Sequence, residues 1–247
     1  MTNAPLLSVA ELQRLQEFST PTLSNAIETF EVRPRNEGYM NASIRCLQPV
    51  SKPMVGYAVT GRFRCAEPPA PGQGASRFEY WKWLTSIPEP RVVVLQDVDE
   101  PPGVGSFWGE IQATIHLALG CVGTVTNGGV RDLEEVQALG FYYFAAHVAV
   151  SHADVHLVDF GAPVEVGGVT VHPGQLIHAD PHGVLLIPGE VAPYLAEVAE
   201  AYEAVEQDFV SKVRAPDSSP DRLTAEYESF AARRSALRPP PGFRAGR

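Results

Sequence analysis

The stretch that decides the fold is SFWGEIQATIHLALGCVGTVTNGGVRDLEEVQALGFYYFAAHV, residues 106–148. Residues 106–120 have the spacing of a helix that Ser106 caps and Gly120 ends, and residues 121–127 form a short apolar run typical of a buried strand. A second helix, ended by Gly140, and a second strand at 142–148 follow in the same order. Helices that alternate with short buried strands predict an α/β core.

The flanking segments extend this pattern in both directions. The elements predicted before residue 106 are helices opening at Ser8 and at Thr20–Pro21, strands at 55–63 and 91–98, a proline- and glycine-rich loop at 66–76, and a helix with Phe78, Tyr80, Trp81 and Trp83. Aromatic side chains at this helical spacing indicate core or subunit interface more than a binding pocket. Beyond residue 151 the chain is β-rich, and Gly167–Gly168 predicts a two-residue hairpin.

The last predicted element is a long helix with one apolar seam. The residues of this seam recur every three or four positions over about six turns: Val191, Leu195, Val198, Tyr202, Val205, Phe209 and Val213. A seam this narrow packs on its own domain or crosses to another subunit. We predict one domain over residues 1–213, with N-terminal helices in 1–32 and the long helix in 190–213. The extension at 214–247 is expected to lack structure in part or to lie on a neighbouring subunit.

Composition and charge exclude several classes of protein. With 247 residues, 45% of them hydrophobic, the chain can bury a full core, and a net charge of −10 argues against a nucleic-acid surface. No apolar stretch approaches the roughly 18 residues of a membrane span. The first 15 residues lack the parts of a secretory signal, and the three cysteines lack disulfide or zinc-site spacing. We expect a cytoplasmic protein without membrane or nucleic-acid partners.

The segment TNGGVRD, residues 126–132, carries the first candidate chemistry. It follows a predicted strand, and ligands of open α/β sheets usually bind at the carboxyl ends of the strands. The Arg131 fork matches a substrate carboxylate, and the Asp132 carboxylate is a hard oxygen ligand for Mg²⁺ or Mn²⁺. Gly128 and Gly129 let a ligand approach the backbone. The simpler interpretation is that Asp132 caps the following helix and Arg131 is solvated.

A second carboxylate favours a site over a simple cap. Glu110 precedes Arg131 with twenty residues between them and stands at the start of a predicted helix. The unpaired N–H groups of that first turn, Gly109 to Gln112, can bind a carboxylate or enolate oxygen. Since consecutive elements usually lie side by side, Glu110 is expected near the Arg131–Asp132 turn. Together these groups could polarise a 2-oxo acid.

Residues 107–145, together with PVEVGGVTVHPGQLIHADPHGVLLIP at 163–188, resemble the family that contains the regulator of ribonuclease activity A and the class II 4-hydroxy-4-methyl-2-oxoglutarate aldolases. The resemblance runs over roughly residues 20–206 and is strongest over 108–188. It implies an α/β fold of the layered α/β/β/α swivelling-domain type, with N-terminal helices and a long C-terminal helix. It also implies a homotrimer or hexamer with sites between subunits.

In the aldolases of this family, an aspartate is followed after twenty residues by Arg-Asp. The resemblance implies that Arg131 binds the substrate carboxylate, that Asp132 holds Mg²⁺ or Mn²⁺, and that Gly109, Glu110, Ile111 and Gln112 contact the pyruvyl group. Glu110 occupies the position of the motif's aspartate, one methylene longer, with an expected catalytic role in positioning water on the metal. The aldolases also use a glutamate from a neighbouring subunit's C-terminal helix, which the resemblance assigns to Glu206, with Glu203 close by.

The resemblance implies a metal-dependent lyase that cleaves a 4-hydroxy-2-oxo dicarboxylic acid to pyruvate through a metal-stabilised enolate, with oxaloacetate decarboxylation as a side activity. Two alternatives stay open: a non-catalytic regulator of ribonuclease E or another enzyme, and a related lyase or decarboxylase on a different oxo acid. Family members that inhibit ribonuclease E generally lack the full constellation. Because Glu110, Arg131 and Asp132 are all present, catalysis is favoured.

Five of the seven histidines, His147, His152, His156, His178 and His182, lie close together in sequence. Two pairs stand four residues apart, but that spacing joins side chains on a helix, and these segments have the pattern of strands and turns. A structural or substrate-pocket role is therefore preferred over a metal site. The segment SHADVHLVDFG differs from the usual aldolase sequence, so the distal group of the substrate stays open.

Overall fold

The structure is a computed structural model that describes residues 6–215 and 219–244. Residues 1–5, at the start of the segment expected to lack a secretory signal, lie outside the described residues, as do residues 216–218 and 245–247 of the C-terminal extension. Within the described ranges, no helix is long and apolar enough to cross a membrane. The three cysteines are free thiols, as predicted.

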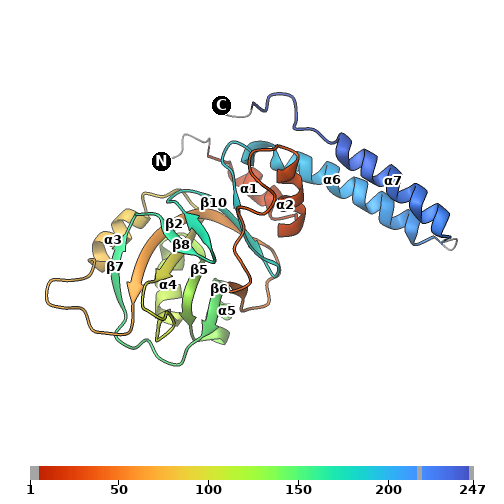
Figure 1. The fold of residues 1–247 in the computed structure, drawn as a ribbon. Helices are drawn as coiled ribbons and strands as arrows, with labels where there is room; N and C mark the ends of the chain where they lie inside the picture. Colours follow the sequence, from red (N-terminus) through yellow and green to blue (C-terminus); the bar gives the residue numbers. More distant parts are fainter. Residues whose placement is uncertain (1–5, 216–218, 245–247) are drawn as a thin grey trace.

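A nine-stranded sheet organises the described chain (Figure 1). Its central strands β2, β3, β5 and β6 are parallel, and β10 continues the sheet antiparallel to β2. The order is β1-β6-β5-β3-β2-β10-β11, with β4 paired to β5 and β7 paired to β2, while β8 and β9 form a separate hairpin. The strands are β1 Arg45–Cys46, β2 Met54–Arg64, β3 Arg91–Asp97, β4 Ser106–Trp108, β5 Cys121–Val130, β6 Tyr142–Val148, β7 His156–Phe160, β8 Val164–Val166, β9 Val169–Val171, β10 Leu176–Asp180 and β11 Gly183–Ile187.

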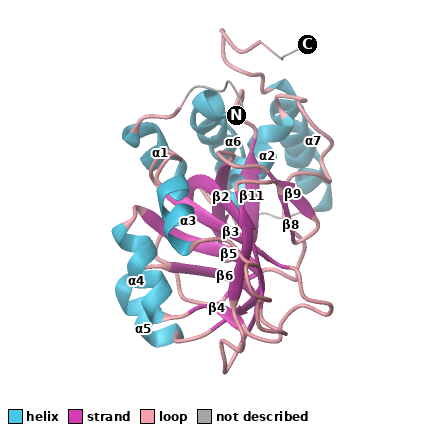
Figure 2. Cartoon of the chain, turned by 90° about the vertical axis from the view of Figure 1, so that its left-hand side faces the viewer, coloured by secondary structure: helices cyan, strands magenta, loops and turns pink. Residues whose placement is uncertain are grey.

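Helices cover the sheet in two groups. Figure 2 shows α3, α4 and α5 along one side of the sheet, with α1, α2, α6 and α7 gathered at one end of the molecule. The helices are α1 Val9–Leu15, α2 Thr20–Glu28, α3 Arg77–Leu84, α4 Glu110–Ala118, α5 Leu133–Leu139, α6 Ala192–Val213 and α7 Pro220–Ala236. A large apolar core lies between the sheet and these helices, and a second core lies on the opposite face against the β8–β9 hairpin. The mixed α/β fold expected from the sequence is confirmed.

Local capping chemistry explains several element boundaries. Ser8 and Glu11 form a reciprocal capping box at the start of α1, as the sequence predicted for Ser8. Gly140 ends α5 in the left-handed conformation with φ +75°, and Gly167–Gly168 turn the β8–β9 hairpin with φ +59° and +77°. These three predictions are confirmed. Each could be made from the sequence because it depends only on the conformation of a few neighbouring residues.

The predicted helix cap at Ser106 is wrong. Residues 106–108 form β4 and pair with β5, and α4 begins only at Glu110. The Ser106 hydroxyl lies 2.6 Å from the Trp108 carbonyl oxygen and 2.8 Å from the Gly129 carbonyl oxygen, and it accepts a hydrogen bond from the Trp108 N–H at 3.0 Å. Ser106 therefore ties β4 to β5 instead of opening a helix.

The long C-terminal helix packs on its own chain through its first half. Leu195, Val198 and Tyr202 are buried, so this part of the seam serves the domain itself. Farther along α6, the Phe209 ring stacks on Phe230 of α7 at 4.8 Å between centroids. Helix α7 was not predicted, since the extension after residue 213 was expected in part to lack structure. The domain boundary at residue 213 stays a prediction.

Candidate active site

The Arg131–Asp132 turn joins the end of β5 to the start of α5. Asp132 has φ +57° and ψ +48°, a left-handed conformation that residues other than glycine seldom adopt, and its side chain makes no capping hydrogen bond to α5. Its Oδ2 atom instead accepts a hydrogen bond of 2.9 Å from the backbone N–H of Glu110. The simpler interpretation, in which Asp132 caps its own helix, is therefore wrong, because this carboxylate caps the neighbouring helix α4.

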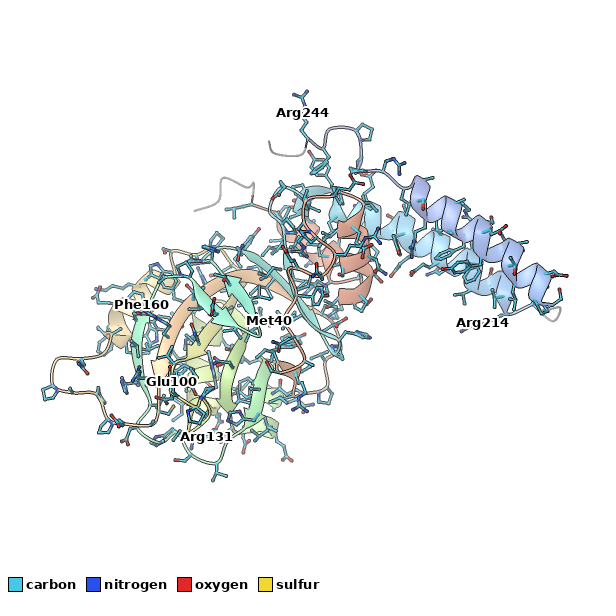
Figure 3. The ribbon with its side chains drawn as sticks, in the orientation of Figure 1. Met40, Glu100, Arg131, Phe160, Arg214 and Arg244 are labelled. Atoms are coloured by element: carbon cyan, nitrogen blue, oxygen red, sulfur yellow. The ribbon has the colours of Figure 1, made fainter. Side chains whose placement is uncertain are left out.

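Three segments meet at this carboxylate. Arg131 Nε lies 3.7 Å from Asp132 Oδ2, with the two side chains 36% and 33% exposed, and the Arg131 N–H donates to the Trp108 carbonyl at 3.2 Å. A Cβ atom on Gly109 would lie 2.5 Å from Asp132 Oδ2 and 3.1 Å from Arg131 Nε. The structure thus brings Gly109, Glu110, Arg131 and Asp132 together, as the sequence predicted. We call these four residues the cradle; a side chain at position 109 would fill it. Figure 3 shows the place of Arg131 in the fold.

The other predicted backbone donors lie on the same helix turn. The Glu110 N–H is already bonded to Asp132, so the amides of Ile111 and Gln112 remain as the open donors of this first turn. The Ile111 side chain is 72% exposed, whereas the Gln112 Oε1 atom is buried without a hydrogen-bond partner among the described residues. The predicted roles of these residues toward a substrate stay predictions.

Glu206 lies on α6, a helix that extends away from the part of the sheet near α4 and α5 (Figure 1). Burial, and then the charge of the neighbouring Glu203, raise the pKa of Glu206. Its predicted role requires a second subunit, so this assignment also stays a prediction.

Glycine is required at both positions of TNGGVRD by packing inside the protein, not by the approach of a ligand. They lie within β5 rather than in a turn. A Cβ atom on Gly128 would lie 2.7 Å from the Phe63 ring, and a Cβ atom on Gly129 would lie 2.7 Å from Ala149 and 2.9 Å from His147 Nε2. The protein's own side chains occupy the space beside both glycines. The expectation that they leave room for a bound 2-oxo acid is therefore wrong.

The donor set at the turn fits Mg²⁺ or Mn²⁺. Residues 6–215 and 219–244 contain no group of three or more His, Cys, Asp or Glu side chains arranged to hold a metal, as a structural zinc site would require. Mg²⁺ is usually held by one or two carboxylates and keeps several waters or substrate oxygens. One oxygen of Asp132 is bonded to α4, and in the described part of the chain no hydrogen bond involves the other. That oxygen is available to a hard cation.

Sequence reasoning missed the residues that shape the loop next to the site. Asp97, at the end of β3, accepts hydrogen bonds from the backbone N–H groups of Asp99 at 3.0 Å and Gly103 at 2.8 Å. Asn127 in β5 accepts the Asp97 N–H at 2.8 Å. Burial raises the pKa of Asp97. The sequence pattern that could have revealed this role is an aspartate at the end of a buried apolar strand, followed by a loop rich in proline and glycine.

The histidines are distributed over several structural contacts. His147 Nε2 lies 3.3 Å from the Gly103 carbonyl. His178 is fully buried, with Nδ1 2.9 Å from the Thr20 hydroxyl and Nε2 3.1 Å from the Leu15 carbonyl. His182 Nδ1 lies 3.1 Å from Asp180 Oδ1. None of the described histidines belongs to a metal-holding group, and His178 anchors the N-terminal helices to β10.

We expect Gly109→Ala to weaken divalent-metal binding by at least about tenfold, as changes to the groups that orient a metal ligand typically do. The new Cβ atom would lie 2.5 Å from the Asp132 carboxylate and displace it. Isothermal titration with Mn²⁺ measures the loss. Circular dichroism should show unchanged helix content, since φ −163° at Gly109 is open to any residue. Wild-type affinity in this variant would contradict the proposed cradle.

Comparison with known proteins assigns the chain to a family. Residues 20–186 match the RraA-like family, described as Aldolase/RraA. Protein DlpA of Legionella pneumophila is 25% identical over 183 residues, 72% of this chain, and the chain spans about 28% of that relative's length. A protein of Halalkalibacterium halodurans named "Putative 4-hydroxy-4-methyl-2-oxoglutarate aldolase" is 31% identical over 81 residues, which cover 32% of this chain and 39% of that protein.

A solved structure shows the same fold. RraAS2 of Streptomyces coelicolor, described as an unusual member of the RNase ES inhibitor RraA protein family, superposes with a TM-score of 0.65 at 21% identity, covering 82% of this chain and 98% of that one. The family match itself covers well over half of the 247 residues. The protein belongs to the RraA-like family.

Proposed function

We propose that the protein is a divalent-metal-dependent carbon–carbon lyase that cleaves a 4-hydroxy-2-oxo dicarboxylic acid to pyruvate, with oxaloacetate decarboxylation as a side activity. The observation that carries the proposal is the left-handed Asp132, whose carboxylate faces the first turn of α4 beside Arg131. Both the aldolase name of one relative and the donor set at this turn support it. Mg²⁺ or Mn²⁺ is the proposed cofactor, and Asp132 the residue that holds it.

In this proposal, each residue of the cradle has a separate task. The Arg131 guanidinium pairs with Asp132 through Nε at 3.7 Å and has no hydrogen bond to another side chain in the described ranges. Its other N–H groups would bind the substrate carboxylate through two parallel hydrogen bonds. The amides of Ile111 and Gln112, at the positive end of α4, stabilise negative charge on the 2-oxo oxygen. A bound divalent cation supplies Lewis-acid stabilisation of that same charge.

Bond cleavage then follows from proton transfer at the distal hydroxyl. A base removes the hydroxyl proton, and the hydroxyl-bearing carbon becomes the carbonyl carbon of a second oxo-acid product as the C–C bond breaks. The electron pair of that bond passes into the pyruvate enolate, and a proton returned to the enolate carbon gives pyruvate. We propose that Glu110, at the head of α4, orients the water that carries this proton. Because Asp132 binds the Glu110 amide, the Asp132 carboxylate lies beside the backbone of the residue that carries the second carboxylate.

The assembly and location belong to the same proposal. We infer a homotrimer or hexamer in which Glu206 of α6 reaches a neighbouring subunit's site, in the cytoplasm, with a small 2-oxo acid as the ligand. A regulator that binds ribonuclease E or another enzyme remains the alternative, since a solved protein of the same fold is described as belonging to an RNase ES inhibitor family.

Pyruvate release from 4-hydroxy-4-methyl-2-oxoglutarate and from oxaloacetate tests the lyase. With Mg²⁺ or Mn²⁺ we expect turnover that EDTA abolishes and added metal restores. If metal-loaded protein releases pyruvate from neither compound, the proposal is wrong. Co-purification of the inactive protein with a ribonuclease would then support the regulator.

A further inference from the structure

The strand β4, which leads into Gly109 and the cradle, is only three residues long and pairs irregularly with β5. Ser106 lies opposite Gly129 and Trp108 lies opposite Val130, so β4 advances two residues while β5 advances one. A pairing of this kind is a β-bulge, and bulges are frequent beside active sites, where they redirect the chain. The place of Gly109 relative to the end of β5 therefore depends on this irregular register.

The Ser106 hydroxyl lies within the irregular pairing. Its Oγ atom is 2.8 Å from the Gly129 carbonyl oxygen on β5 and 2.6 Å from the Trp108 carbonyl oxygen, and it accepts the Trp108 N–H at 3.0 Å. A hydroxyl has one proton, so it donates to one of the two carbonyls at a time. Ser106 is 1% exposed, so these bonds are shielded from water. The hydroxyl thus holds the two strands together at the bulge.

The Trp108 carbonyl connects this hydroxyl to the cradle. The same carbonyl accepts the Arg131 N–H at 3.2 Å, and a carbonyl oxygen has two lone pairs with which to accept both bonds. The next residue along the chain is Gly109, beside which the Asp132 carboxylate lies. Every step from Ser106 to the cradle is therefore a hydrogen bond or a peptide bond.

The register of β4 determines whether the cradle is formed. A shift of β4 by one residue along β5 would move Gly109 and the start of α4 by about 3.3 Å relative to Asp132. The hydrogen bond of 2.9 Å between the Glu110 N–H and Asp132 Oδ2 would then break. Because β4 has only three residues, few backbone hydrogen bonds oppose such a shift. The side-chain bonds of Ser106 add to them.

We propose that Ser106 is the positioning residue of the cradle. Its hydroxyl fixes the register of β4 on β5 and thereby holds the Asp132 carboxylate against the first turn of α4, with one oxygen left for a divalent cation. The inference rests on the proposed function for the role of that cation. Ser106 is too buried to touch a ligand, so it acts through the backbone. Groups that orient a metal ligand typically change metal affinity by about 10- to 100-fold.

The variant Ser106→Ala removes the hydroxyl. We expect its Mn²⁺ affinity, measured by isothermal titration calorimetry, to fall about tenfold. The Arg131 amide should exchange its hydrogen faster than in the wild type, which nuclear magnetic resonance measures directly. If the activity is as proposed, the apparent KM for metal should rise more than kcat falls. Should this variant not fold, Ser106→Cys fills the space with a weak S–H donor, and the same two changes are expected.

Thr124→Val is the matched control. Thr124 is fully buried in the first half of β5, and its hydroxyl donates to the Val93 carbonyl of β3 at 2.8 Å. This variant therefore also loses a buried hydroxyl-to-carbonyl bond between two strands, but away from β4. We expect a lower thermal unfolding temperature, as for Ser106→Ala, with wild-type Mn²⁺ affinity and wild-type exchange at Arg131. A merely structural role for Ser106 would make the two variants alike.

The outcomes separate the positioning role from the lyase. If the wild type binds Mn²⁺ and the Ser106 variant binds it equally well, the positioning role is wrong and the lyase proposal stands. If the wild type binds no Mn²⁺, the lyase proposal fails and hydrogen exchange decides the role of Ser106. Faster exchange at Arg131 in the Ser106 variant than in Thr124→Val would then support control of the register, and equal exchange would overturn it.

Discussion

Asp132→Asn should lower metal-dependent pyruvate release about 10³-fold, which corresponds to about 4 kcal/mol of lost transition-state stabilisation. Asparagine tolerates the left-handed conformation at φ +57° and can still accept the Glu110 N–H. The turn and the start of α4 therefore stay in place, while the negative charge offered to the cation disappears. The measurement is kcat/KM for pyruvate release over a range of Mn²⁺ concentrations.

Glu134→Gln provides the control for a change of one charge. Glu134 is exposed in the first turn of α5, two residues beyond Asp132. We expect its activity to stay within about twofold of wild type, because an exposed charge of this kind is largely screened. Activity of Asp132→Asn within tenfold of wild type would remove Asp132 from the proposed cation site.

The second large effect is a loss of stability in mild acid. His116 and His178 are both fully buried, and burial lowers the pKa of each to about 4 from an ordinary value of 6.5. The unfolded chain therefore takes up protons at these positions before the folded chain does. Between pH 6.5 and pH 4, the free energy of unfolding should fall by about 3 kcal/mol for each histidine. This pH dependence fades as the pH rises about one unit above 6.5, where the unfolded chain no longer takes up protons at these positions.

Urea unfolding at several pH values between 7 and 4.5 measures this loss. His178→Asn removes one titrating group, so its free energy of unfolding should depend less steeply on pH than that of the wild type, whatever its stability at pH 7. His172→Asn, which changes an exposed histidine, should keep the wild-type slope. If the free energy of unfolding depends equally on pH in all three proteins, His178 does not change its protonation on unfolding and the prediction is wrong.

Local sequence patterns predicted most of the fold. The caps at Ser8 and Gly140 and the Gly167–Gly168 turn depend on the conformational preferences of a few neighbouring residues, so they can be found without the rest of the chain. Ser106 was misassigned because serine is both a common helix cap and a side chain that can bridge strands. Only its contacts with the Gly129 and Trp108 carbonyls, set by strand pairing, decide between the two.

The sequence predicted that Gly109, Glu110, Arg131 and Asp132 lie together, but it did not predict the hydrogen bonds between them. The spacing between Glu110 and Arg131 brought the right segments together, because a short connection returns the chain to the next strand. The sequence does not reveal that Asp132 turns away from its own helix, since this depends on a left-handed backbone conformation at a residue other than glycine. Nor does it show the Gln48 side chain, which joins the Leu133 carbonyl, 85 residues away, to the Tyr143 N–H, 95 residues away.

The hydrogen bond between the Asp132 carboxylate and the head of α4 has a thermodynamic consequence. A carboxylate that already accepts an N–H beside an arginine has part of its negative charge compensated, so a ligand that adds negative oxygens would strengthen the binding of a divalent cation. A 2-oxo acid would bring its own negative oxygens to the cation and occupy the arginine at the same time. In the proposed lyase, cation and oxo acid would therefore be linked ligands, each of which raises the affinity of the other.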